Sequence, residues 1–326
     1  MNKYKKFLGR TDLVKNQVER EKLAEQEAVS KRKRSIQQQN RQRFLKYQEQ
    51  LRSELAARYF HSVQSTGGDA DAQDADAQAF ITVASITDST QQSAINTFVT
   101  DLKGYGIWTK MKAIYPFVGG TASSHKYNLK DPQDTDAAFR LVFNGGWTHN
   151  ATGALPNGTN GWADTFVKTG TDLALNSTHV SVYLRTDTAA ADRLAIGNCF
   201  GGANFELSLW VKHSGNSTSH RNNTNTNSTV SDTDSRGFYI GNRNSSTQQK
   251  IIKNNTINTF SANSVATTNT RTINISSALS AYNTTRAYYN NKEYALSSIG
   301  DGLTDTEAAN LYTAVQAFQT TLSRQV

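Results

Sequence analysis

The chain has 326 residues, of which 37% are hydrophobic, and it carries a formal net charge of +8 at pH 7. Its single cysteine excludes an intramolecular disulfide framework. No apolar run approaches the roughly 18–20 residues of a membrane span, and the basic first residues precede no apolar segment of a standard signal peptide. We therefore expect a protein that is made and kept in the cytoplasm, or released by lysis, with no membrane partner.

The positive charge is concentrated in an N-terminal arm. Residues 1–63 contain 16 Lys and Arg against 7 Asp and Glu, whereas the rest of the chain contains 19 against 20. The arm has no proline and one glycine, and it is rich in strong helix formers such as Ala, Glu, Gln, Lys, Arg and Leu. The composition predicts a long basic helix that reaches beyond its own domain and anchors the protein to something else.

The arm has a charged middle and an apolar end. The charge run indicates docking onto an acidic protein surface, with contact to phosphate or a solvated helix face as the alternatives. Apolar residues then follow at spacings of three or four, as in an amphipathic packing helix. The predicted docking residues are Lys31, Arg32, Lys33, Arg34, Arg41, Arg43, Phe44, Tyr47, Leu51, Leu55 and Tyr59. Signatures of nucleic-acid-binding folds and an aromatic platform for single strands are absent, so nucleic-acid contact is not favoured.

A linker and a helix separate the arm from the remainder. Residues 64–79 are small, polar and rich in Asp–Ala repeats, which predicts a flexible acidic linker. Residues 80–112 have apolar side chains on one side of a helix, an N-cap at Asp88 or Ser89, and glycines at its end. We expect this bridging helix to pack on the body.

Residues 113–326 form the predicted body. Short apolar runs with period-two alternation, separated by turn residues, predict mainly β structure in an antiparallel sandwich. Residues 214–229 contain almost only Ser, Gly, Asn and Thr, and they predict an exposed loop because they can bury little apolar surface. The last segment predicts a closing C-terminal helix, with Thr304 as N-cap and Glu307 three residues later in a capping box.

Two segments of the body resemble a known family. Residues 115–131 (YPFVGGTASSHKYNLKD) and 299–307 (IGDGLTDTE) are similar to the opening and closing of concanavalin-A-like (laminin-G-like) domains in tailed-bacteriophage structural proteins. The resemblance covers roughly residues 80–326 and does not extend to the arm. It implies a jelly-roll-like sandwich and a place on a virion. It implies no particular ligand, because one fold serves many functions.

The sequence carries no recognisable catalytic motif. Its six histidines are scattered without metal-ligand spacing, and there is no nucleophile elbow, P-loop or paired-carboxylate motif. Glu206 is alone in its predicted strand, which disfavours glycoside hydrolysis. Cys199 is predicted to be a small buried side chain rather than a nucleophile. We expect a protein that is not an enzyme and that needs no cofactor.

Binding is the remaining class of chemistry. Lectin-like relatives hold sugar rings on aromatic platforms and calcium on acidic side chains in edge loops, so the resemblance implies two sets of candidates. The glycan candidates are Trp147 and Trp162, and the calcium candidates are Asp187, Asp192, Asp232 and Asp234. For each of them, packing or an ordinary turn position is the competing interpretation.

These observations predict a structural component of a tailed-phage virion. The basic helix would dock to the capsid, portal or tail, with other virion proteins and copies of the chain itself as partners. The alternative is an adhesin of the particle that binds host glycan through the sandwich. A third hypothesis is that the arm binds packaged DNA.

Overall fold

The computed structural model describes residues 32, 73–200, 207–265, 271–280 and 285–326. The chain divides into two units, Met1–Ala72 and Gln73–Val326, and the fold described below is that of the second unit. The predicted basic arm and its docking residues lie outside the described residues, apart from Arg32, which is exposed. No helix in the described part of the chain is long and apolar enough to cross a membrane.

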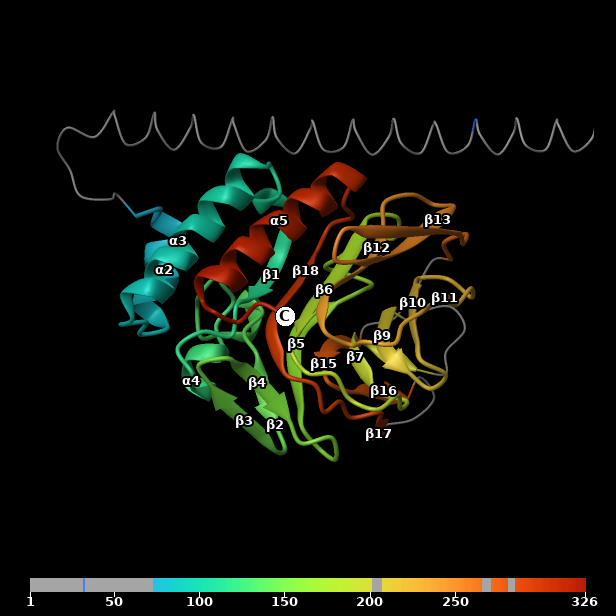
Figure 1. Cartoon of the computed structure of the whole chain (residues 1–326), viewed down its shortest axis with the longest axis horizontal. Coiled ribbons are helices and arrows are strands. Elements are labelled where there is room, and N and C mark those ends of the chain that lie inside the picture. Colours follow the sequence, from blue (N-terminus) through green and yellow to red (C-terminus); the bar gives the residue numbers. More distant parts are fainter. Residues whose placement is uncertain (1–31, 33–72, 201–206, 266–270, 281–284) are drawn as a thin grey trace, which may run out of the picture. The chain divides into compact units, whose positions relative to one another are not determined.

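Of the described helices, two precede the strands of the body, one short helix lies between β1 (Met111–Tyr115) and β2 (Val142–Asn144), and one follows the last strand (Figure 1). They are α2 (Ala75–Val83), α3 (Ser89–Gly104), α4 (Ala122–His125) and α5 (Asp305–Thr321), with the 3-10 turns η1 (Trp108–Lys110) and η2 (Asp136–Ala138). The side chain of Asp88 accepts from the amide of Gln91 and caps α3, as predicted. The predicted capping box between Thr304 and Glu307 is also present at the start of α5. Capping motifs in the sequence therefore predicted where both long helices, α3 and α5, begin.

The linker prediction is wrong at its C-terminal end. Residues 75–79 form the start of α2, with Asp74 as its N-cap, and the predicted bridging helix over 80–112 is the end of α2 followed by α3 and η1. Lys103 in α3 lies 2.7 Å from Asp74 and 2.6 Å from Asp76, which ties the two helices together. Asp74 and Asp76 are typical of a flexible linker by composition. They are equally suited to a helix N-terminus, where negative charge is favourable.

Two large sheets form the body. The first contains, in spatial order, β14 (Thr256–Ser261), β13 (Gln248–Lys253), β12 (Gly237–Arg243), β6 (Thr178–Leu184), β18 (Tyr294–Gly300), β4 (Gly153–Pro156) and β3 (Trp147–Asn150), with β1 (Met111–Tyr115) also paired to β18. The second contains β11 (Ser228–Ser231), β10 (Ser217–Asn222), β9 (Leu207–His213), β7 (Leu194–Gly197), β15 (Thr272–Ile275), β5 (Trp162–Lys168) and β2 (Val142–Asn144). A small third sheet contains β17 (Arg286–Ala287), β16 (Ala278–Ser280) and β8 (Cys199–Phe200). Neighbouring strands in the two large sheets are antiparallel, so the chain is mainly an antiparallel β-sandwich.

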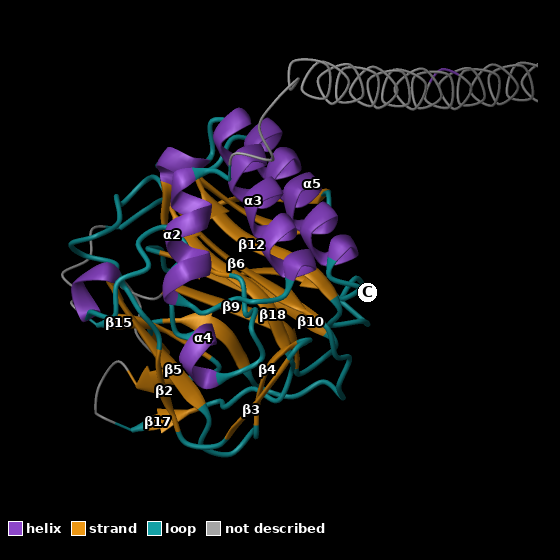
Figure 2. Cartoon of the chain, turned by 90° about the vertical axis from the view of Figure 1, so that its left-hand side faces the viewer, coloured by secondary structure: helices purple, strands orange, loops and turns teal. Residues whose placement is uncertain are grey.

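The first sheet is covered on both faces. Val180 and Val182 of β6 belong to the core between the sheets, whereas Tyr183 belongs to a second core beneath the helices. Figure 2 shows α2, α3 and α5 packed over the strands on this side. The rings of Phe98 and Phe318 stack at 4.9 Å where α3 meets α5. This helix layer explains why all seven residues of β6 are buried, without the polar alternation of a solvated strand.

The prediction of an exposed loop over 214–229 is also wrong. The segment contains β10 and β11, and Thr218, His220 and Asn222 along β10 are all buried. Thr218 donates a hydrogen bond of 2.5 Å to Asp232, which lies just beyond β11. Composition excluded an apolar core for this segment, but a buried strand can instead be held by hydrogen-bonded polar side chains.

Candidate functional site

A surface pocket lies at one open edge of the sandwich. β14 is the outer strand of the first sheet and β11 is the outer strand of the second, and β11 packs against β13. The pocket has a volume of about 490 Å³ and is lined by Val230, Ser231, Asp232, Tyr239, Lys253, Asn254, Thr256 and Asn258. We call it the edge pocket. Its volume lies in the range of small-molecule sites, roughly 300–1,000 Å³.

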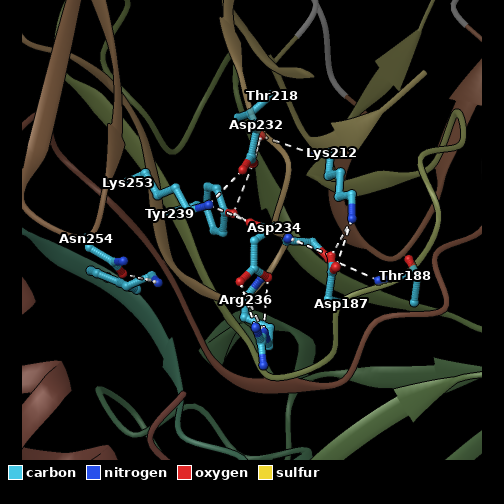
Figure 3. A network of polar contacts seen from close by, with 12 residues as sticks. Asp187, Thr188, Lys212, Thr218, Asp232, Asp234, Arg236, Tyr239, Lys253 and Asn254 are labelled. Carbon is cyan, nitrogen blue, oxygen red and sulfur yellow. Dashed lines mark hydrogen bonds and ion pairs between the residues drawn. The ribbon is translucent and has the colours of Figure 1, made fainter. Parts of the chain in front are cut away.

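Asp232 forms a fixed acidic point in the wall of the edge pocket (Figure 3). Its side chain is only 2% exposed, and Lys253 Nζ lies 2.6 Å from Oδ1. The hydroxyl groups of Thr218 and Tyr239 donate to Oδ2 at 2.5 and 3.0 Å. Burial, followed by the nearby Asp232 carboxylate, raises the pKa of Tyr239, so its phenol remains a donor. Three donors therefore hold this carboxylate in one orientation before any ligand arrives.

A second acid is held on the other side of the same loop. Lys212 Nζ lies 2.7 and 2.9 Å from the two carboxylate oxygens of Asp187. The backbone amide and hydroxyl of Ser235 donate to Asp187 at 2.9 and 2.8 Å. Burial alone would raise the pKa of Asp187, but the hydrogen bonds from Lys212 and Ser235 hold it well below the usual value. The loop between β11 and β12 is therefore held at Asp232, by Thr218 and Tyr239, and at Ser235, by Asp187 (Figure 3).

The structure brings three of the four calcium candidates together and gives each a basic partner. Asp187 pairs with Lys212, Asp232 pairs with Lys253, and Asp234 pairs with Arg236 at 2.9 Å. In the described part of the chain, no group of three or more His, Cys, Asp or Glu side chains is arranged to hold a metal ion. Ammonium and guanidinium groups of the chain itself therefore neutralise these acids.

The fourth calcium candidate, Asp192, is outside this network. It is exposed, and it accepts hydrogen bonds from the hydroxyl and, at 3.3 Å, the amide of Ser214. These hydrogen bonds hold the pKa of Asp192 below its usual value. Asp192 therefore joins its own loop to the turn that contains Ser214, which is a structural role.

The two glycan candidates lie at the opposite edge of the sandwich, on β3 and β5. Trp147 Nε1 donates to the carbonyl of Trp162 at 3.3 Å, so the two residues are adjacent. The ring of Trp147 packs edge-on against Phe143 at 5.2 Å, and the guanidinium carbon of Arg286 lies 3.4 Å from the centre of the Trp162 ring. These contacts favour packing roles over an open sugar platform.

Two histidines of the described residues lie beside serine hydroxyls: His213 Nε2 is 3.1 Å from Ser217 Oγ at the partly exposed end of β9, and His179 is wholly buried. His179 Nε2 is 3.1 Å from Ser298 Oγ, which is 2.6 Å from Ser181 Oγ. All three side chains are at most 1% exposed, and burial lowers the pKa of His179 to about 4. The group joins the buried centres of β6 and β18, and no substrate reaches it in this arrangement.

Sequence reasoning missed most of the edge pocket. Lys253, Asn254, Thr256 and Asn258 come from the β13–β14 hairpin, and they meet Asp232 only because β13 packs near β11. A weak local signal was present, because Thr256 and Asn258 alternate on one face of β14, the outermost strand of the first sheet among the described residues. That signal marks a polar edge strand but does not show what lies opposite.

No family model and no curated protein matches the chain. Among solved structures, a mutant Trypanosoma rangeli sialidase displaying trans-sialidase activity is 10% identical over 70% of this chain and 39% of its own, with a TM-score of 0.47. The botulinum neurotoxin serotype D binding domain is 9% identical over 64% of this chain and 52% of its own, with a TM-score of 0.41. Domain 4 of AbnA, a GH43 extracellular arabinanase from Geobacillus stearothermophilus in complex with arabinotriose, is 11% identical over 62% of this chain and 98% of its own, with a TM-score of 0.40.

All three TM-scores lie below 0.5, so these likenesses establish neither a family nor a ligand for this chain. The chain matches less than half of the sialidase's length. The ligand must therefore be argued from the edge pocket itself.

Proposed function

We propose that the chain is a carbohydrate-binding protein without enzymatic activity, and that the edge pocket is its ligand site. The observation that carries this proposal is the set of uncommitted polar groups in the pocket. The side chains of Ser231, Thr256 and Asn258 make no hydrogen bond to the described residues, and Asn254 uses only its Oδ1, to accept from the amide of Phe238. Hydroxyl and amide groups both donate and accept, as sugar hydroxyls do.

The edge pocket favours an uncharged part of a ligand, because its two charged lining residues pair with each other. Asp232 is neutralised by Lys253, so the pocket presents no net charge although it offers a carboxylate and an ammonium group. Both groups are held by other residues of the wall, which lowers the entropy cost of ordering them on binding. Because Lys253 already neutralises the acid, we propose that binding needs no metal ion.

Glycan binding can be tested with the full chain on a glycan array, with and without a chelator. We expect specific binding that the chelator leaves unchanged. Thr256→Val combined with Asn258→Leu should weaken it roughly tenfold or more, because each change removes ligand hydrogen bonds and leaves the strand intact. Thr259→Ala, on the exposed opposite face of β14, is the matched control and should bind like the unaltered chain. A flat array, or binding that the double variant retains in full, would sink the proposal.

A second function rests on a different observation, the separation of charge along the sequence. Residues 1–63 carry a large excess of Lys and Arg, whereas the remainder of the chain is near neutral. We propose that this arm forms a long basic helix that docks the protein to the capsid, portal or tail of a tailed-phage virion. In that setting, the body would be a jelly-roll-like sandwich that presents the edge pocket on the particle.

Deleting residues 1–63 tests the docking role. We expect the truncated chain to be absent from purified particles, because the segment with the excess positive charge has been removed. Incorporation is measured by immunoblotting particles from an infection in which the truncated chain replaces the full one. The double pocket variant is the control and should still incorporate. A truncated chain that incorporates normally rules out anchoring by the arm.

A further inference from the structure

The outer edge of β14 has no partner in the described part of the chain. β14 is the outermost strand of the first sheet, and β13 is the only described strand that pairs with it. On the two sides of this sheet, α5 packs against β12 and β11 packs against β13. No described element other than β13 packs extensively against β14, so its outer edge is open among these residues.

The pairing with β13 shows which backbone groups of β14 face outward. Lys253 and Thr256 flank the two-residue turn between the strands, so they form a hydrogen-bonded pair. Hydrogen-bonded and non-hydrogen-bonded pairs alternate along an antiparallel ladder. The amide and carbonyl groups of Ile257, Thr259 and Ser261 therefore point away from β13, toward the open edge. They form a regular row of donors and acceptors that another strand can pair with.

The edge lacks the features that usually protect an open strand. Residues Thr256–Ser261 include no charged residue and no proline, and their pairing with β13 contains no bulge. Proteins commonly place lysine, proline or a bulge on an open edge, because an unprotected strand pairs with another chain. A regular, uncharged edge strand of six residues is therefore typical of an interface.

We propose that β14 pairs antiparallel with β14 of a second copy of the chain, about a two-fold axis at Thr259. In this register Thr259 faces its counterpart, and Ile257 of each copy faces Ser261 of the other. The outward backbone groups then form about six hydrogen bonds between the copies. A second copy fits better than a charged segment, because the neutral edge brings no like charges together and opposed threonines are favourable neighbours. The two-fold axis closes the assembly at two copies.

The pairing adds an aromatic side chain to the edge pocket, and this step rests on the proposed function. Thr256, Asn258 and Phe260 alternate on one face of β14, and the first two line the pocket. With Thr259 at the axis, Asn258 faces Phe260 of the second copy in a non-hydrogen-bonded pair, where opposed side chains are closest.

The edge pocket of a single copy offers little aromatic surface. Tyr239 is the aromatic residue among its described lining residues, and its side chain is buried. Phe260 is half-buried at the neighbouring position along β14 on the same face. Phe260 of the second copy therefore supplies a flat apolar surface for a sugar ring, while Thr256 and Asn258 bind its hydroxyl groups. Each pocket of the dimer is built from residues of both copies.

Sedimentation velocity of the full chain without ligand, over a range of concentrations, tests the pairing. We expect a weak monomer–dimer equilibrium, because a single strand edge forms a small interface. Thr259→Lys and Thr259→Glu should each raise the dissociation constant about tenfold, because each places like charges face to face. An equal mixture of the two variants should dimerise again, since opposite charges then meet across the axis.

Two further variants are matched controls. Thr148→Lys changes an exposed threonine on β3, at the other edge of the same sheet, and should dimerise like the unaltered chain. Thr259→Ala keeps every backbone group of the edge and should also dimerise. Thr259→Glu tests the interface even where Thr259→Lys fails to fold, because Lys250 lies opposite position 259 on β13 and favours an acidic neighbour.

A titration with the strongest saccharide from the array tests the contribution of Phe260. The unaltered chain, at concentrations where it is dimeric, should bind this saccharide about fivefold more tightly than Thr259→Glu does at the same concentration. Equal affinity in the dimeric chain and the monomeric variant overturns the role of Phe260 in the pocket.

The remaining outcomes separate the pairing from the proposed function. A monomer at every concentration overturns the pairing, whether or not saccharide binds. A dimer that both charged variants retain overturns β14 as the interface. A dimer that the charged variants lose, in a chain that binds no saccharide, supports the pairing and overturns the glycan function.

Discussion

Replacing Lys253 with methionine is expected to destabilise the fold by about 3 kcal/mol and to abolish ligand binding in the edge pocket. Lys253 supplies the only positive charge within 2.6 Å of Asp232 in the described structure, and that carboxylate is 2% exposed. Removing one partner of a buried ion pair costs about 3–5 kcal/mol, and the lower end applies here because Thr218 and Tyr239 still donate to the acid. Urea unfolding at pH 7 measures the change.

The matched control for this prediction also removes the charge of Asp232, which Lys253→Met leaves without its partner. In the double variant Asp232→Asn/Lys253→Met, neither residue is charged, so we expect most of the lost stability to return. Ligand binding should remain weak, because both pocket groups have changed. A single Lys253→Met variant as stable as the unaltered chain would show that water, rather than Lys253, compensates Asp232.

Replacing Lys292 with methionine is expected to stabilise the fold at neutral pH. Burial, followed by the charges of Arg193 and Lys212, lowers the pKa of Lys292 from 10.5 to about 8. The unfolded chain therefore holds the proton more tightly than the folded one, which penalises folding fully below pH 8. Between pH 8 and 10.5 the penalty falls, so the free energy of unfolding rises with pH. At about 1.4 kcal/mol per pH unit, Lys292→Met should gain up to about 3 kcal/mol at pH 7.

Unfolding by urea at several pH values between 7 and 10.5 checks this sign. The difference between Lys292→Met and the unaltered chain should shrink as the pH rises, while Lys168→Met, which alters an exposed lysine, stays level with the unaltered chain. A Lys292→Met variant that is less stable at pH 7 would mean that the ammonium group has a compensating partner.

Local sequence signals predicted the elements that depend on neighbouring residues. Asp88 caps α3, and Thr304 with Glu307 forms the capping box of α5, because a cap involves residues only three positions apart. Period-two alternation predicted the antiparallel sandwich for the same reason. Errors arose where tertiary contacts decide. Residues 75–79 are helical because Asp74 caps α2, and β10 is a buried strand held by hydrogen bonds that composition does not reveal.

In the candidate site, too, the sequence predicted single residues but not the residues that pair with them. The aspartates at 187, 232 and 234 could be named from their residue type and loop positions. Their partners could not, because Lys212 lies 25 residues from Asp187 and Lys253 lies 21 residues from Asp232. The pairing of distant strands brings these groups together, so three of the calcium candidates are held in ion pairs with basic side chains of the chain itself.

The most direct test of the central proposal is a titration of the full chain with the strongest saccharide from the array, followed by the same titration of Thr256→Val/Asn258→Leu. We predict saturable binding by the unaltered chain, unchanged by chelator, and roughly tenfold or greater weakening in the double variant, with Thr259→Ala unaffected. Equal affinity in the unaltered chain and the double variant, or no saccharide binding at all, would contradict the assignment of the edge pocket.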